Sequence, residues 1–176
     1  MVSKSSGWAQ TQRKPSNSEP LYRRALDIRQ AALGADHPDT SSSLDSLGRN
    51  YFDQNKYRDA EALFRRALTI REKSLGAGHP DVARSLTNLA AVCYGQKRYV
   101  EAESHYRRGL AILEESLGRT HPEFAASLEN YAEILRKLKR KEEAIEVEGR
   151  VSDLKRGLRR SRIFIGPDVN NGLRAP

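Results

Sequence analysis

Histidines are the first residues to consider for chemistry in this 176-residue chain, because imidazole binds metals and carries protons. Three of the four histidines, His37, His79 and His121, each precede a proline and recur at a constant interval along the sequence. Ligands of one metal ion must all lie about 2 Å from it, which residues in successive repeats cannot do. We therefore expect these three at or near helix N-caps and predict no metal site. The fourth, His105, is expected at the surface or at the rim of a groove.

Cys93 is the only cysteine, and it could act as a nucleophile only as a thiolate. No basic neighbour in the sequence would lower its pKa, so we expect it to be packed in the core. A single thiol also excludes a disulfide framework and zinc sites built on several cysteines. The sequence has no glycine-rich phosphate loop and no nucleophile elbow. We therefore predict a protein that is not an enzyme and uses no cofactor.

Pairs of arginines recur at the same interval as the histidines and are chemically suited to bind phosphate. A glutamate precedes the first arginine of each pair by four residues, which is the favourable orientation for an ion pair on a helix. We therefore expect these residues on a solvated helix surface. The pairs are Arg23 and Arg24, Arg65 and Arg66, and Arg107 and Arg108, and the glutamates are Glu19, Glu61 and Glu103.

The formal net charge of +8 is unevenly distributed. Residues 19–134 carry 16 basic and 17 acidic side chains, whereas residues 135–162 carry 11 basic and 5 acidic ones. The second segment could attract nucleic acid or an anionic surface. No aromatic residue is interleaved with its charges before Phe164, as base stacking would need. Nucleic-acid or anionic-surface binding through residues 135–162 is therefore an alternative function and not the leading one.

The sequence also bears on the cellular location. The longest uncharged apolar run, at residues 89–94, has 6 residues, far fewer than the roughly 20 of a membrane span. The first twenty residues lack the apolar core of a signal peptide. We therefore predict no membrane span and a cytoplasmic location.

An internal sequence repeat must position all these side chains. Residues 21–62 and 63–104 are identical at 20 of 42 positions without a gap. Apolar residues such as Val82, Leu86 and Cys93 recur at a helical period, and each unit predicts two helices with one apolar stripe each. A glycine in the left-handed conformation is expected to end each unit, and a proline to open the next. Such pairs bury their stripes only by stacking, which predicts an all-α superhelix of antiparallel helix pairs.

The spacing of small and aromatic residues resembles that of tetratricopeptide repeats. The usual repeat has about 34 residues. The longer unit here, which ends in Leu-Gly-x-x-His-Pro-[Asp/Glu], resembles the repeats of kinesin light chains. A period of about 40–47 residues also suits HEAT or armadillo repeats, which lack this spacing. The residues that carry the resemblance are Leu89, Ala90, Tyr99, Ala102, Tyr106 and Leu110.

The resemblance implies that the first helix of each unit lines a concave groove that binds an extended peptide. In kinesin light chains, the asparagine before the Leu-Ala of the first helix contacts the peptide backbone. This implies that Asn88 and Asn130 do so here, whereas the first unit has Ser46. An amide suits this role because it both donates and accepts hydrogen bonds. Arginines near these positions would attract acidic side chains of the ligand, and they are Arg49, Arg84 and Arg136.

The leading prediction is a non-catalytic scaffold for a protein or peptide ligand with acidic side chains. Residues 1–17 show no heptads, so the expected scaffold lacks the heavy-chain-binding coiled coil of kinesin light chains. Self-association through an unpaired first helix is a further alternative. Lys141 and Glu148 replace tyrosines in the last unit, which is expected to cap the array. The predicted segments are a disordered tail at 1–17, a repeat array at 18–158 with an unpaired helix at 18–34 and units at about 38–76, 80–118 and 122–158, and a basic, disordered tail at 159–176.

Overall fold

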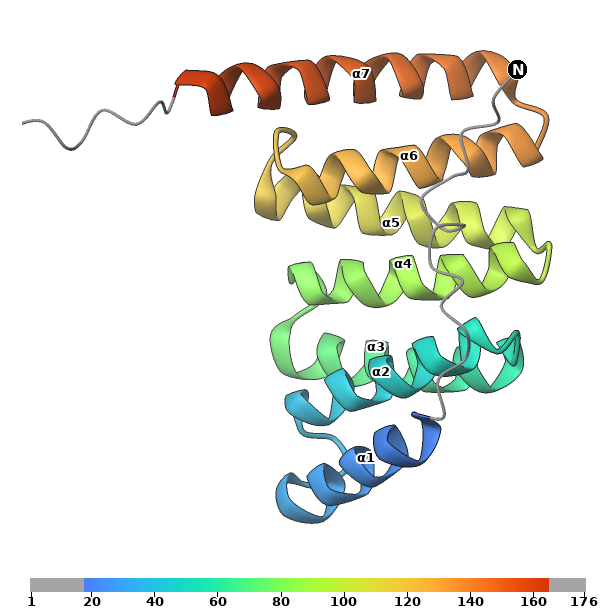
Figure 1. Ribbon diagram of the computed structural model, residues 1–176, viewed down its shortest axis with the longest axis vertical. Coiled ribbons are helices and arrows are strands. Elements are labelled where there is room, and N and C mark those ends of the chain that lie inside the picture. The colour runs from blue at the N-terminus through green and yellow to red at the C-terminus, as the bar shows by residue number, and fades with distance from the viewer. Residues whose placement is uncertain (1–17, 165–176) are drawn as a thin grey trace, which may run out of the picture.

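The computed structural model describes residues 18–164, with side chains up to residue 157. This part of the chain contains seven helices and no strand, and the helices stack in chain order, each antiparallel to the next (Figure 1). The predicted all-α fold of helix pairs is confirmed. The helices are α1 (Glu19–Leu33), α2 (Pro38–Asp53), α3 (Tyr57–Leu75), α4 (Pro80–Gly95), α5 (Tyr99–Leu117), α6 (Pro122–Lys137) and α7 (Lys141–Phe164).

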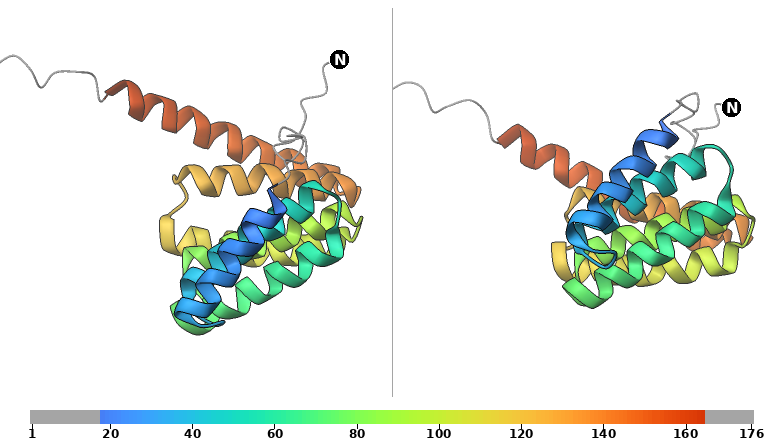
Figure 2. Two further views of the ribbon diagram at one scale, coloured as in Figure 1. Left: turned by 60° about the horizontal axis from the view of Figure 1, so that its bottom comes forward. Right: turned by 90° about the horizontal axis from the view of Figure 1, so that it is seen from below.

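The stack twists along its length, so that α1 and α7 point in different directions when it is seen from below (Figure 2). Each unit pairs a first helix with a second helix, as α2 pairs with α3, α4 with α5 and α6 with α7. Units join where α3 packs on α4 and α5 on α6. Helix α2 also contacts α4 directly. The first helices of neighbouring units therefore form a continuous surface.

Each first helix begins at the repeated His-Pro dipeptide. Nδ1 of the histidine accepts a hydrogen bond from the backbone N–H two residues later, at 3.1 to 3.2 Å. Proline follows, where its missing N–H costs nothing, and an acidic residue then faces the positive end of the helix dipole. The predicted N-cap role of these histidines is confirmed. They are His37, His79 and His121.

Helices α1, α3, α5 and α7 correspond to the second helix of a unit, and we call them second-type helices. Each of the first three ends at a glycine with a positive φ angle. Gly34, Gly76 and Gly118 have φ values of 95°, 87° and 81° and ψ values of 159°, 155° and 161°. The positive φ was expected, but the conformation is extended and not left-handed helical. Only glycine adopts this region readily, because it lacks a Cβ atom.

Replacing Gly76 with alanine should lower the free energy of unfolding by about 1–3 kcal/mol. No atom lies within 4 Å of the place that a Cβ would take, so the loss comes from backbone strain alone. Gly78 in the same loop has equally open surroundings and no positive φ. Gly78→Ala is therefore the matched control and should change stability by less than about 0.5 kcal/mol. Equal losses in urea denaturation of the two variants would contradict this explanation.

One face of α1 is not covered by the described residues. Helices α3 and α5 each lie between two first helices, whereas α1 packs on α2 alone. Ile70 on α3 is therefore 3% exposed, but its equivalent on α1, Ile28, is 57% exposed. Leu21 is likewise 69% exposed. The predicted helix without its own first partner is thus present, with apolar side chains facing outward.

Helix α7 differs from its predicted extent. It runs to Phe164, past the start of α6 and beyond the expected end of the array at residue 158 (Figure 1). Its inner side chains, Ala144, Val147 and Val151, pack into the core. The expected tails at 1–17 and beyond residue 164 lie outside the described residues. None of the helices in the described part combines the length and apolar character that a bilayer span requires.

Candidate functional site

The exposed side of the first helices brings four of the five predicted binding residues onto one face. Arg49 lies on α2, Arg84 and Asn88 lie on α4, and Asn130 lies on α6. Both arginines are exposed and both asparagines are partly buried. We call this side the first-helix surface. Its residues are Ser42, Ser46, Arg49, Arg84, Asn88, Ala91, Ala126, Asn130 and Glu133.

A buried carboxylate on α2 connects two of these residues to the protein interior. Asp45, 2% exposed, accepts a hydrogen bond from Nδ2 of Asn88 at 3.4 Å, and its other oxygen lies 3.8 Å from Nε of Arg84. From the interior, Nη1 of Arg71 reaches that oxygen at 2.7 Å and also donates to Oγ of Ser85 at 2.5 Å. The ion pair between Asp45 and Arg71 is therefore buried. Through Asp45 it fixes the side chain of Asn88 from the interior side of α4.

The Asp45 contact leaves Asn88 able to bind a ligand. The hydrogen bond to Asp45 uses one N–H of the Asn88 amide. The second N–H and the carbonyl oxygen of this amide are left for hydrogen bonds to a ligand. Arg84 is less available, because Asp81 lies 3.1 Å from its guanidinium. No carboxylate in residues 18–157 forms an ion pair with Arg49, but its charge acts on the Asp53 carboxyl one turn later in α2, where it opposes the rise in pKa that burial causes. Of the two arginines on this surface, Arg49 is the less closely paired.

Asn130 is held in a similar way one unit further along. Its side chain lies close enough to the hydroxyl of Tyr106 on α5 to act on the pKa of that hydroxyl, which it lowers. Tyr106 is buried, and burial raises the pKa of its hydroxyl well above the usual range. Both predicted asparagines are therefore positioned by contacts within the protein, which the sequence did not reveal.

Arg136 is not grouped with the other four predicted residues. Its Nε and Nη2 donate to the two carboxylate oxygens of Glu148 on α7, at 2.7 and 2.8 Å. Hydrogen bonds from Arg136 lower the pKa of the Glu148 carboxyl, so the pair is charged at neutral pH. The guanidinium of Arg136 thus ties α6 to the last helix.

A further cluster joins α4 to α6 at the far end of the first-helix surface. The hydroxyl of Tyr94 donates to Glu133 at 3.0 Å, and Nζ of Lys137 lies 3.7 Å from the same carboxylate. The Lys137 ammonium also sits 6.0 Å from the centre of the Tyr94 ring. Burial, and then Glu133, raise the pKa of Tyr94. Because Tyr94 has no tyrosine equivalent in the other units, no repeat signal indicated this cluster.

Glutamates at the starts of second-type helices link each unit to the next. They meet cations 37 residues later, in the turn between the two helices of the following unit. The predicted pairs four residues apart form at the first two glutamates, at 3.1 and 2.7 Å, whereas the third glutamate pairs elsewhere. We call the inter-unit contacts the turn-edge ion pairs. They are Glu19–Lys56 at 3.4 Å, Glu61–Arg98 at 2.7 Å and Glu103–Arg140 at 2.6 Å.

The remaining candidates for chemistry are structural. Cys93 is fully buried, and burial raises the pKa of its thiol, which opposes thiolate formation. The predicted core role of Cys93 is confirmed. Burial and the charge of Arg65 lower the pKa of the half-buried His105. Within residues 18–164, no group of three or more His, Cys, Asp or Glu residues is placed to hold a metal ion.

The predicted basic segment at 135–162 is largely paired where its side chains are described. These pairs include contacts to α5, within α6, between α6 and α7 and within α7. Paired charges project a weaker field, so this segment offers less attraction to nucleic acid than its composition indicates. The paired residues are Arg136, Lys137, Arg140, Lys155 and Arg156.

Comparison with known proteins relates this architecture to one family. The tetratricopeptide repeat family matches residues 7–73, 52–115 and 81–156, which together span most of the chain. Two crystal structures of a candidate kinesin light chain from Podosopora anserina, with nearly identical TPR-like repeats, have TM-scores of 0.70 and 0.68. Each is 23% identical, and the match covers 83% of this chain and 69% of that one.

A third solved structure shows the same arrangement. The crystal structure of BtubC (BKLC) from P. vanneervenii has a TM-score of 0.74 at 16% identity. The match covers 90% of this chain and 61% of that one, so the chain spans about three-fifths of that protein. At these identities the likeness shows the fold. No curated protein matches the sequence.

Proposed function

Because the chain belongs to the tetratricopeptide repeat family, we propose that it is a scaffold that binds a protein partner on the first-helix surface. Binding, and not catalysis, is its proposed activity. The observation that carries the proposal is the placement of Asn88 and Asn130 at equivalent positions on neighbouring first helices. Asn88 donates a hydrogen bond to Asp45, and Asn130 lies beside the buried hydroxyl of Tyr106. Side chains fixed before binding lose less freedom when a ligand arrives, which favours affinity.

The ligand in this proposal is an extended segment. An extended backbone presents N–H and C=O groups along its whole length, so amides on successive units can each bind a different peptide group. Such contacts read the backbone and tolerate many ligand sequences. Ser46 takes this position on α2 and supplies a hydroxyl in place of an amide.

The charge of the first helices limits how acidic the ligand can be. The segments of α2, α4 and α6 together carry seven acidic and four basic side chains. A strongly acidic ligand would therefore be repelled by the surface as a whole. We propose a ligand with an acidic side chain beside Arg49. Arg84 contributes less because Asp81 shares it, and Arg136 contributes least because Glu148 holds it.

The proposal is tested with extended peptides selected for binding to the full chain from a display library. Asn88→Ala combined with Asn130→Ala should weaken the selected peptides by about tenfold or more, because two hydrogen bonds worth about 0.5–1.5 kcal/mol each are lost. Fluorescence anisotropy measures the affinity. Circular dichroism checks that the helices remain.

The matched control replaces exposed residues of second-type helices, Lys73→Ala with Glu115→Ala, and should leave affinity unchanged. Arg49→Glu should weaken peptides that carry an acidic residue and spare neutral ones. Selected peptides that bind the double asparagine variant as tightly as the unaltered chain would remove the first-helix surface as the binding site.

A further inference from the structure

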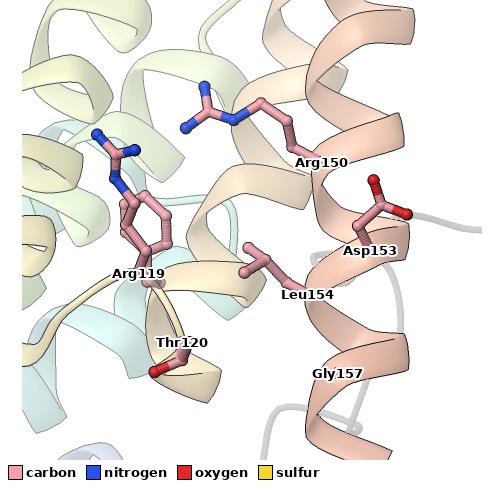
Figure 3. A pocket seen from close by; sticks show the side chains of 7 residues that line it. Arg119, Thr120, Arg150, Asp153, Leu154 and Gly157 are labelled. Atoms are coloured by element: carbon pink, nitrogen blue, oxygen red, sulfur yellow. The ribbon is translucent and has the colours of Figure 1, made fainter.

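A pocket at the C-terminal end of the stack lies apart from the first-helix surface. It has a volume of about 480 Å³, opens to solvent, and is lined by the loop between α5 and α6, the start of α6 and the second half of α7. Phe124 and Leu154 give it an apolar lining, Arg119 and Arg150 contribute cationic groups, and Asp153 contributes a carboxylate at its edge. In Figure 3, Arg150 and Leu154 point from α7 toward the loop, whereas Asp153 points away from it. The pocket thus combines apolar surface with cationic groups.

Arg150 is the fourth arginine, after Arg24, Arg66 and Arg108, that takes the same position in successive units, and the second and third have partners in the unit before their own. Arg66 donates to the carbonyl oxygen of Ala35 at 3.2 Å. Arg108 forms an ion pair with Glu72 at 2.5 Å. Arg150 has no ion pair with any side chain in the range 18–157. Arg150 therefore lies at the edge of the pocket without the partner that Arg66 and Arg108 have.

The sequence supplies a partner for Arg150, but another residue uses it. Glu114 is the equivalent of Glu72 in the next unit, and it would complete the series. Instead, Nε of Arg119 donates to Glu114 at 2.5 Å. The loop arginine thus occupies the carboxylate that would otherwise neutralise Arg150. A ligand that brings its own carboxylate would restore the missing pair.

We infer that this pocket binds a segment of a partner protein in which an acidic side chain adjoins a large apolar one. The carboxylate pairs with the guanidinium of Arg150, a geometry that Arg favours. The apolar side chain packs on Phe124 and Leu154, which removes apolar surface from water. The inference rests on the proposed protein-binding function, but the pocket shares no residue with the first-helix surface.

The test uses the full chain and two probes, acetyl-Asp-Phe-amide and its neutral counterpart acetyl-Asn-Phe-amide. Each is titrated while the backbone amide shifts are followed by NMR. The acidic probe should shift amides in residues 119–124 and 150–157 and bind about tenfold more tightly than the neutral one. Arg150→Gln should reduce binding of the acidic probe by about tenfold. Arg108→Gln, the equivalent change one unit earlier, should not affect it.

Several results would overturn the inference. Equal affinities of the two probes, or an Arg150→Gln variant that binds as the unaltered chain does, would exclude a carboxylate site at Arg150. Tighter binding of 3-phenylpropionate than of acetyl-Asp-Phe-amide would assign the pocket to small carboxylic acids and exclude a peptide site. The Asn88→Ala and Asn130→Ala double variant should keep full affinity for the acidic probe. A loss there would place the probe on the first-helix surface, leaving the proposed function intact and removing the pocket.

Discussion

Asp45→Ala should lower the free energy of unfolding by about 3–5 kcal/mol, because it leaves the guanidinium of Arg71 buried without its counter-ion. Both side chains are almost inaccessible to solvent, at 2% and 1% exposed, and their charged atoms are 2.7 Å apart. Nη2 of Arg71 has no hydrogen-bond partner among the described residues even in the intact protein. The site therefore has no spare acceptor for the charge. Urea denaturation followed by circular dichroism measures the loss.

The repeat itself supplies the control for this experiment. The next unit has Thr87 and Leu113 at the positions of Asp45 and Arg71. The double variant Asp45→Thr with Arg71→Leu should therefore recover most of the lost stability, since an apolar replacement of a buried pair is often neutral. A double variant as unstable as Asp45→Ala, or an Asp45→Ala variant that loses less than about 1 kcal/mol, would contradict the role of the pair.

Ile70→Ala should cost about 2–5 kcal/mol of unfolding free energy, whereas Ile28→Ala should cost less than about 0.5 kcal/mol. The two isoleucines occupy the same position in successive units and differ in burial, at 3% and 57% exposed. Removing a buried side chain leaves a cavity, while removing an exposed one leaves none. The comparison therefore isolates the effect of the covering helix. Denaturant titrations of both variants measure it.

The same pair of variants examines the alternative of self-association. A loss at Ile28 as large as that at Ile70 would mean that another segment or a second copy covers α1 in solution. Repeating the titration at two protein concentrations separates these cases, because only association depends on concentration. An Ile28→Ala variant with unchanged stability at both concentrations agrees with an uncovered α1.

Features that recur in every unit could be predicted from the sequence, because repetition identifies them without knowledge of the neighbours. The starts of the first helices follow from His-Pro and an acidic residue, and the structure begins each of them at the proline. The repeated glutamates also predicted ion pairs with the arginines four residues later, and these form at Glu19 and Glu61. Glu103 instead pairs with Arg140 across the unit boundary, because the repeat does not show which cations the neighbouring unit supplies.

Features that occur in only one unit could not be predicted. The same positions as Asp45 and Arg71 hold Thr87 and Leu113 in the next unit and the exposed ion pair Glu129–Lys155 in the last one, so only the packing shows that the first pair is buried. The placement of Asn88 and Asn130 on the first helices followed from the family resemblance. Their partners within the protein did not, because Asp45 and Tyr106 meet them only through the packing of neighbouring helices. The pocket depends on how α7 lies against the loop before α6, and the spacing of residues in the sequence does not predict this packing.

The turn-edge ion pairs also have a mechanical consequence. They fasten all three unit boundaries on one side of the stack, at the turns within the helix pairs. On the opposite side, the arginine series reaches a partner at the first two boundaries and leaves Arg150 unpaired at the third. Within residues 18–157, the last helix pair, α6 and α7, is therefore fastened to the preceding unit by an ion pair at one edge only. We expect its slow motions to be largest at the opposite edge, where the pocket beside Arg150 lies.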